Sequence, residues 1–125
     1  MIQDAHAAGW RLISGLLGMT AVILGAVGAH AVSDIQAAAS IERAALYQLV
    51  HAAVLLFSTL LSGKLASIAR WAIFLGVCLF CGSIYAKYFL SLTQATQFAP
   101  SGGILLMCGW LAFSVSGFIA YIKRR

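Results

Sequence analysis

The apolar stretch LISGLLGMTAVILGAVGAHAV, residues 12–32, decides the fold class of this 125-residue chain. A helix of about 20 mainly apolar residues crosses a bilayer, and this stretch contains no charged residue. Its small residues recur at alternating spacings of four and three, which places them on one stripe of a helix: Ser14, Gly18, Ala21, Gly25 and Gly28. Because membrane helices approach closely where small residues meet, the stretch predicts a transmembrane helix that packs against a neighbour.

The end of this stretch also matches a signal-peptidase site. Ala29-His30-Ala31 has the small-x-small pattern of such a site, and Arg11 places a positive charge before the apolar run. The run is longer than the roughly 7–15 residues of a usual signal peptide. We therefore interpret residues 12–32 as a retained transmembrane helix.

Composition extends this interpretation to the whole chain. Hydrophobic residues make up 62% and charged residues only 9%, and the mean hydropathy is +0.98. Soluble domains contain about 25% charged residues, so this chain could not cover a surface that faces water. The net charge of +5 comes from scattered basic residues, which excludes a nucleic-acid-binding groove and nucleic acid as a partner.

Three further stretches are apolar enough to span the bilayer. We expect helices at residues 12–32, 44–61, 68–92 and 102–122, joined by short links. This order predicts an all-α, integral membrane, up-down four-helix bundle that forms one transmembrane domain over residues 1–125. The linker 33–43 predicts a surface turn or short helix, with Ser33 and Gln36 as a weak capping box.

Basic residues predict the orientation of the bundle. In an up-down arrangement six of them fall on one side: Arg11, Lys64, Arg70, Lys123, Arg124 and Arg125. Short cytoplasmic loops carry an excess of Lys and Arg, so both termini are expected to face the cytoplasm, or the matrix of a mitochondrion. Three aromatic residues near the membrane boundaries are expected to act as interfacial anchors: Trp10, Tyr88 and Tyr121.

Four local motifs together resemble a known family. They are GAVGAHAV at residues 25–32, YQLVHAAVLL at 47–56, LFCGSIYAKYF at 79–89 and APSGGILLMCGWLAF at 99–113. In this order they resemble the YgdD family, small four-span membrane proteins of bacteria with mitochondrial relatives. The resemblance implies a multi-pass protein of the bacterial inner membrane and no established activity. Cys81 and Lys87 depart from the family pattern.

Polar side chains gather in the half of the predicted bundle that lies opposite the termini: His30, Tyr47, Gln48, His51, Ser83, Tyr85 and Lys87. Polar residues inside a bilayer usually face the bundle interior and mark functional sites, which predicts a ligand or interaction pocket. The alternative is a set of interhelical hydrogen bonds, with His30 facing headgroups and Lys87 reaching outward or pairing with Asp34 or Glu42. His51 is expected to point into the bundle and to find a hydrogen-bond partner.

Glycines are predicted to form the close helix contacts: Gly18, Gly25, Gly28, Gly102, Gly103 and Gly109. Metal or haem binding has little support. Cys78 and Cys81 could ligate a soft metal, but buried thiols more often behave as small hydrophobes. His30 and His51 differ in expected depth by about 7–10 Å, too much for a shared ligand. We therefore expect no metal site and no cofactor.

The sequence contains no motif typical of an enzyme active site, and no acid lies inside a predicted span. We therefore expect a non-enzymatic helper or accessory subunit, embedded in the lipid bilayer and contacting other membrane components or a larger membrane protein complex. The alternative is a module that binds a small ligand, such as a quinone, a lipid or a metal ion, near His51.

Overall fold

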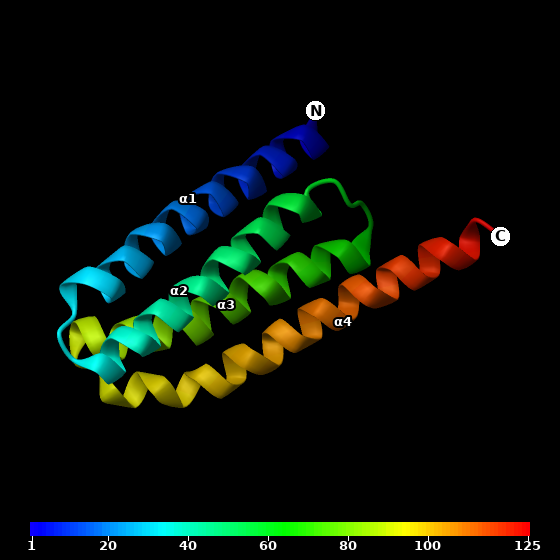
Figure 1. Ribbon diagram of the computed structural model, residues 1–125. Coiled ribbons are helices and arrows are strands. Elements are labelled where there is room, and N and C mark those ends of the chain that lie inside the picture. Colours follow the sequence, from blue (N-terminus) through cyan, green and yellow to red (C-terminus); the bar gives the residue numbers. More distant parts are fainter.

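The fold is all-α and runs up and down four times. In this computed structural model the backbone is described over residues 1–125, and side chains are described for all residues except 2 and 3. The elements are α1 (Ile2–Ala31), α2 (Ile35–Ser58), α3 (Lys64–Leu90), the short 3₁₀ helix η1 (Thr93–Phe98) and α4 (Ala99–Lys123). Both termini and the α2–α3 loop lie at one end of the molecule, here called the terminal end (Figure 1). The α1–α2 turn and η1 lie at the other, here called the hairpin end.

Helix α2 begins earlier than expected. The linker predicted at residues 33–43 is mostly helical, because α2 already begins at Ile35. The cap is Asp34, whose side chain accepts a hydrogen bond of 2.7 Å from the backbone nitrogen of Ala37. A carboxylate at this position also complements the helix dipole. The predicted capping box at Ser33 and Gln36 is therefore wrong by one residue.

The helices differ in whether their length and hydropathy suit a membrane span. Within the part of the chain that the structure describes, three segments are long and apolar enough to cross a bilayer: Asp4–Ala31, Lys64–Leu90 and Thr93–Lys123. Helix α2 is not among them, because polar and charged residues interrupt it. It lies between α1 and α3 and packs against both (Figure 1). The least apolar helix thus packs against two neighbouring helices.

The small stripe of α1 faces α2, as expected. A Cβ atom added at Gly18 or Gly25 would lie 3.9 Å from Ala52 or 3.6 Å from Ala45, which is ordinary contact. At Gly28 the fit is tighter, and a Cβ would lie only 3.0 Å from Cγ of Glu42. The stripe therefore lets the two backbones approach, most closely at the hairpin end.

Helices α3 and α4 approach even more closely. A Cβ at Gly102 would overlap the backbone nitrogen of Phe80 and lie 2.9 Å from the carbonyl oxygen of Gly76. A Cβ at Gly109 would lie 2.7 Å from Cδ1 of Ile73. Gly103 was also expected in this contact, but a Cβ there meets nothing within 4 Å. Gly103 takes no part in the contact because it is next to Gly102 in the helix and therefore faces another way.

Trp10 lies in the core instead of at the membrane surface. It is 3% exposed and makes edge-on contacts with Trp71 and Phe74, with ring centroids 5.1 and 5.9 Å apart. The expectation of an interfacial anchor at Trp10 is therefore wrong. The reason is that α1 extends back to Ile2, which places Trp10 well inside the helix and beside α3.

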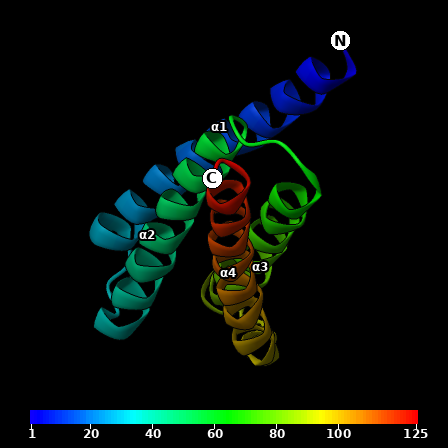
Figure 2. The same cartoon turned by 90° about the vertical axis from the view of Figure 1, so that its right-hand side faces the viewer.

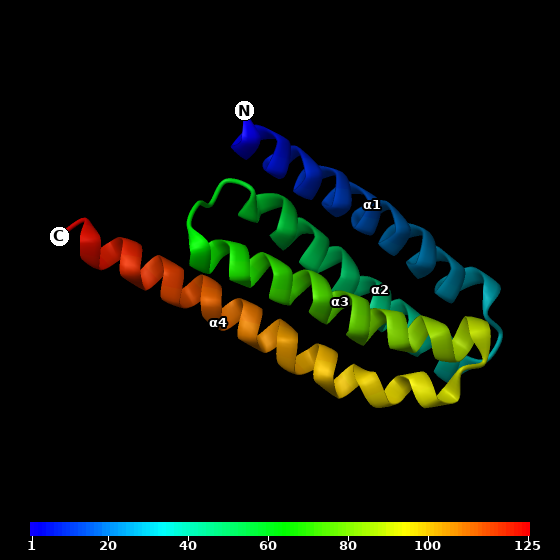
Figure 3. The same ribbon diagram turned by 180° about the vertical axis from the view of Figure 1, so that it is seen from behind.

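The bundle is open on one side. Backbone contacts of α4 are made with α3 and η1, and with neither α1 nor α2. The carboxyl-terminal end of α4 runs beyond the other helices, as the two side views show (Figures 1 and 3). The end-on view shows α1 and α2 as one pair and α3 and α4 as another, splayed apart (Figure 2). A gap therefore separates α2 from α4 toward the terminal end.

Candidate functional site

Gln48 lies at the centre of a hydrogen-bond network that joins three helices. Its Nε2 donates to the carbonyl oxygen of Leu17 and to Oγ1 of Thr20, both at 2.8 Å. Its Oε1 accepts a hydrogen bond of 2.9 Å from the hydroxyl of Tyr85. Both ends of the amide are therefore satisfied, by α1 on one side and by α3 on the other. Buried amides in a membrane need such partners because no water is present to replace them.

His51 joins α2 to α4. It is 5% exposed and points into the bundle, as expected. The indole nitrogen of Trp110 lies 3.1 Å from Nε2 of His51, and the Tyr47 carbonyl oxygen lies 2.6 Å from Nδ1. An indole N–H only donates, so Nε2 accepts and Nδ1 carries the proton that is donated to Tyr47. Both ring nitrogens of an uncharged imidazole are thus engaged.

The other predicted site residues do not join these two groups in one pocket. Tyr47 stacks on His51, but its side chain is exposed. Ser83 is buried and donates to the carbonyl oxygen of Phe80 in its own helix at 2.9 Å. The Nζ atom of Lys87 lies 4.9 Å from the ring centroid of Tyr88, and within the described side chains it forms no ion pair.

His30 is exposed at the end of α1, away from the other polar residues. The Sγ atom of Cys81 is buried and donates to the carbonyl oxygen of Ala44 at 3.2 Å, whereas Cys78 is exposed. No group of three or more metal-ligating side chains occurs in the described part of the chain. The polar residues of the middle of the bundle therefore form interhelical hydrogen bonds and leave no open donor set.

Two concave regions nearer the terminal end are bordered by α2 or by the residues directly after it, and a third lies between the start of α3 and the end of α4. The larger of the first two is an apolar groove of about 630 Å³ between α2 and α4, here called the α2–α4 groove. It is lined by α2 residues between Val50 and Ser58, by Leu61 of the α2–α3 loop, and by Trp110 and Phe113 of α4. The second is a more polar pocket of about 360 Å³, here called the Arg70 pocket. It lies between the first turns of α1, the α2–α3 loop and Arg70.

Sequence reasoning treated Arg70 as a charge beside a loop, and the structure gives it a different role. The side chain is 7% exposed. Its Nη1 donates to the carbonyl oxygens of Ser58 and Leu61 at 2.8 and 3.3 Å, at the end of α2. Arginine near a helix C-terminus can satisfy carbonyl groups that have no partner within the helix. The sequence signal was the apolar surroundings of Arg70, which are unusual for a residue that faces only water.

The fold and these contacts define a class: a small multi-pass membrane protein whose helices are joined by glycine contacts and buried hydrogen bonds. Residues 24–103 match the model of the protein family described as "Protein of unknown function (DUF423)". The chain belongs to this family, which confirms the resemblance to a family of small membrane proteins.

Curated relatives carry matching descriptions. A "UPF0382 membrane protein" of Staphylococcus epidermidis is 35% identical over 114 residues, which cover 84% of this chain and 91% of the relative. A "UPF0382 membrane protein" of Haemophilus influenzae is 32% identical over 109 residues, covering 82% of this chain and 88% of the relative. No solved structure shows a significant match. The comparisons thus support a bacterial membrane protein and assign no activity to it.

Proposed function

We propose that this protein is a non-enzymatic accessory protein of the bacterial inner membrane that binds a transmembrane helix of a partner protein in the α2–α4 groove. The observation that carries the proposal is the open side of the bundle. Helix α4 packs along α3 and makes no backbone contact with α2. The space between α2 and α4 is therefore not filled by a helix of this chain.

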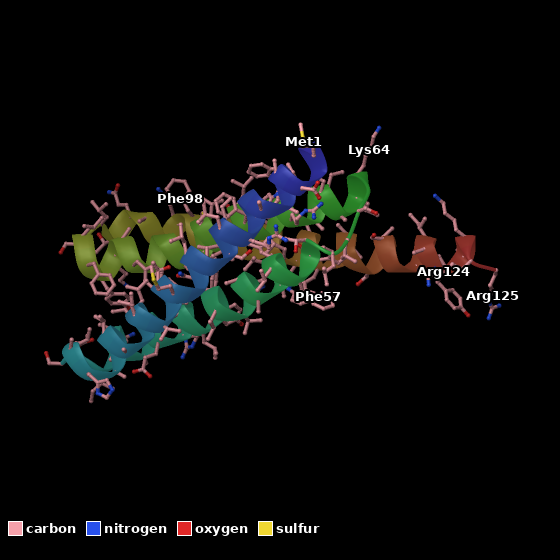
Figure 4. All side chains as sticks on the ribbon, turned by 90° about the horizontal axis from the view of Figure 1, so that it is seen from above. Met1, Phe57, Lys64, Phe98, Arg124 and Arg125 are labelled. Carbon is pink, nitrogen blue, oxygen red and sulfur yellow. The ribbon has the colours of Figure 1, made fainter. Side chains whose placement is uncertain are left out.

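The dimensions of the groove fit a helix. Its α2 wall runs from Val50 to Ser58, which is about 12 Å or slightly more than two helical turns. Side-chain ridges of one helix pack into the grooves of others, and in lipid such packing is the main source of helix association. Ala53 on this wall is small, whereas Phe57 and Phe113 border the groove with large rings (Phe57 is labelled in Figure 4). A partner helix would replace lipid chains that fill this concave surface less well.

The polar residues in the middle of the bundle support a non-catalytic role. The Gln48 amide and both ring nitrogens of His51 are bonded within the protein. A quinone or metal ion at His51 would first have to displace Trp110 or the Tyr47 carbonyl. The accessory role therefore agrees better with these contacts than the ligand-binding alternative does.

The charges support an orientation with both termini in the cytoplasm. The terminal end contains six basic residues in helix ends and loops, and Asp4 is the acid in the same region. Met1 and Lys64 lie at this end, and Arg124 and Arg125 extend beyond it (Figure 4). A cysteine introduced at exposed Lys123 should react with a membrane-impermeant thiol reagent only after the cells are opened. Reaction in intact cells would show that the termini face the outside instead.

Filling the groove tests the proposed partner site. A photo-crosslinking amino acid at Phe57, introduced in living cells, should join the protein to one membrane protein that can be identified by mass spectrometry. Ala53→Trp should abolish co-purification of that protein, because the indole occupies the groove. Ile23→Trp is the matched control, since Ile23 is exposed on α1 and outside the groove.

The proposal requires that Ala53→Trp loses the partner while Ile23→Trp keeps it. Equal co-purification with both variants, or crosslinks from Phe57 to lipid alone, would exclude the groove as the partner site. A small molecule that crosslinks from Phe57 and is released by His51→Ala would instead favour the ligand-binding alternative.

A further inference from the structure

The Arg70 pocket at the terminal end has walls from three helices. Helix α1 contributes His6 and Ala7, the end of α2 and its loop contribute residues from Thr59 to Gly63, and α3 contributes Ser67 and Arg70. Its volume is about 360 Å³, and it is more polar than the α2–α4 groove. It lies apart from the Gln48 and His51 contacts.

The guanidinium of Arg70 has a positive charge that no side chain of the pocket balances. Its Nη1 bonds to two carbonyl oxygens, but its Nε is buried and has no partner. Within the described side chains, the salt bridge that forms joins the Met1 amino group to Asp4 and does not involve Arg70. The residues that line the pocket include no carboxylate. A buried charge is costly unless a counter-charge and hydrogen bonds accompany it. The pocket thus contains an arginine with unused donors and no anion.

The start of α3 adds to the positive potential. This helix of 27 residues begins at Lys64, and its N-cap, Gly63, has a φ of 102° and no side chain to cap the first amides. The free N–H groups and the dipole of a helix start favour an anion. The side chain of Ser67, one turn further on, lines the same pocket. Arg70 and Ser67 therefore border one space, beside the positive end of the α3 dipole.

The depth of Arg70 matches the level of phospholipid phosphates. Arg70 is six residues after the start of α3, which is about 9 Å along the helix axis. The polar headgroup layer on each side of the hydrocarbon core is about 5–8 Å thick. With the start of α3 at the outer edge of the headgroup layer, the guanidinium would lie close to the boundary between headgroups and hydrocarbon, within reach of the phosphodiester groups of the leaflet.

We propose that the Arg70 pocket binds the phosphate group of an anionic phospholipid headgroup. Arg70 donates to phosphate oxygens with the N–H groups that do not bind α2, and the hydroxyl of Ser67, about one turn earlier on α3, donates from the same wall of the pocket. Guanidinium groups bind phosphate in a planar, two-point geometry that lysine cannot reproduce. A soluble phosphate has the same chemistry, but the depth of the pocket favours the lipid. The proposal is independent of the partner helix, because the α2–α4 groove is a separate region.

Lipid binding can be measured on the purified full-length protein in a neutral detergent. Native mass spectrometry with added dioleoyl phosphatidylglycerol should show a retained lipid. Dioleoyl phosphatidylcholine has the same phosphate but should bind about tenfold more weakly, because its choline cation would enter a pocket that contains the positive charge of Arg70 and no carboxylate. Arg70→Gln should reduce phosphatidylglycerol binding by a similar factor. Arg11→Gln is the matched control, because it removes the same charge from an exposed position near the same end.

A second variant covers the possibility that Arg70→Gln does not fold. Ser67→Leu keeps the guanidinium and its bonds to α2 but fills the pocket, so it should lose phosphatidylglycerol to the same extent. The proposal is overturned if both lipids bind equally, or if Ser67→Leu binds phosphatidylglycerol as well as Arg11→Gln does. Glycerol 3-phosphate or inorganic phosphate should not displace the lipid at equal concentration. Displacement by either would identify a soluble phosphate as the occupant and overturn the lipid assignment.

Discussion

The hairpin end and the terminal end of this protein are built in opposite ways. Toward the hairpin end, Gly28 and Gly102 bring backbones together, and the polar side chains of Gln48 and Tyr85 satisfy one another. Toward the terminal end α4 separates from α2, two concave regions open, and Arg70 keeps a donor without a partner. The difference teaches that polar residues within a membrane can bond to one another and leave no open pocket around them. The concave region of about 630 Å³ lies toward the other end, and smaller ones border the hairpin end.

The largest effect is expected where the hairpin end is tightest. Gly102→Ala puts a methyl group against the backbone of Phe80, which cannot turn away as a side chain can. We expect a loss of about 3 kcal/mol in the free energy of unfolding, or failure to fold. The measurement is reversible unfolding in mixed micelles.

The control for this variant is the adjacent glycine. Gly103→Ala has open space around the new methyl group and gains up to about 1 kcal/mol of helix propensity. It should be neutral or stabilising. Equal destabilisation by both variants would mean that α4 does not contact α3 through the Gly102 face.

A smaller effect is expected in the middle of the bundle. Gln48→Leu removes the bonds to Leu17, Thr20 and Tyr85 and leaves the Tyr85 hydroxyl without its acceptor. We expect a loss of about 1–2 kcal/mol, since interhelical hydrogen bonds in membranes are individually weak. Gln36→Leu, at an exposed position of the same helix, is the control and should change little. No difference between the two would show that the network adds nothing to stability.

The smallest effect is expected at the open terminal end. Val115 is 40% exposed on α4, whereas Val77 of α3 is 2% exposed in the core. The same substitution to alanine should cost less than about 0.5 kcal/mol at Val115 and about 1–2 kcal/mol at Val77. Unfolding of both variants in one detergent gives the comparison. A large loss at Val115 would indicate that α4 is covered by another chain in the purified protein.

Fold class, helix order and the α1 stripe could be predicted from the sequence because each depends on composition or on spacing along one helix. The start of α2 was set too late because Glu42 and Arg43 look like the edge of a membrane span. In the structure they lie about two turns inside a helix that begins at Ile35. A hydropathy scale estimates how favourably a residue contacts lipid. It therefore misjudges the ends of a helix such as α2, which packs against two neighbouring helices.

The candidate site was predicted less well than the fold. His51 was expected to point inward and does so, but its partner Trp110 lies 59 positions away in the chain. His30 and Lys87 were predicted to share a site with His51 because all three were expected in the same half of the bilayer, but neither contacts His51. Arg70 was missed as a site residue because counting charges on each side of a membrane does not show which way a side chain turns. Its position depends on where α2 ends, at Ser58.

The bonds from Gln48 to α1 also bear on how the chain enters the membrane. Alone, α2 would carry an unpaired amide, an imidazole and two charged residues toward hydrocarbon, and it is the helix that falls short of the hydropathy of a span. Paired with α1, it presents an amide that Leu17 and Thr20 already satisfy. We therefore expect α2 to leave the translocation channel at a lower free-energy cost when it is paired with α1 than when it is alone. Helix α1 is apolar enough to enter the lipid by itself, so the dependence on a neighbour falls on α2.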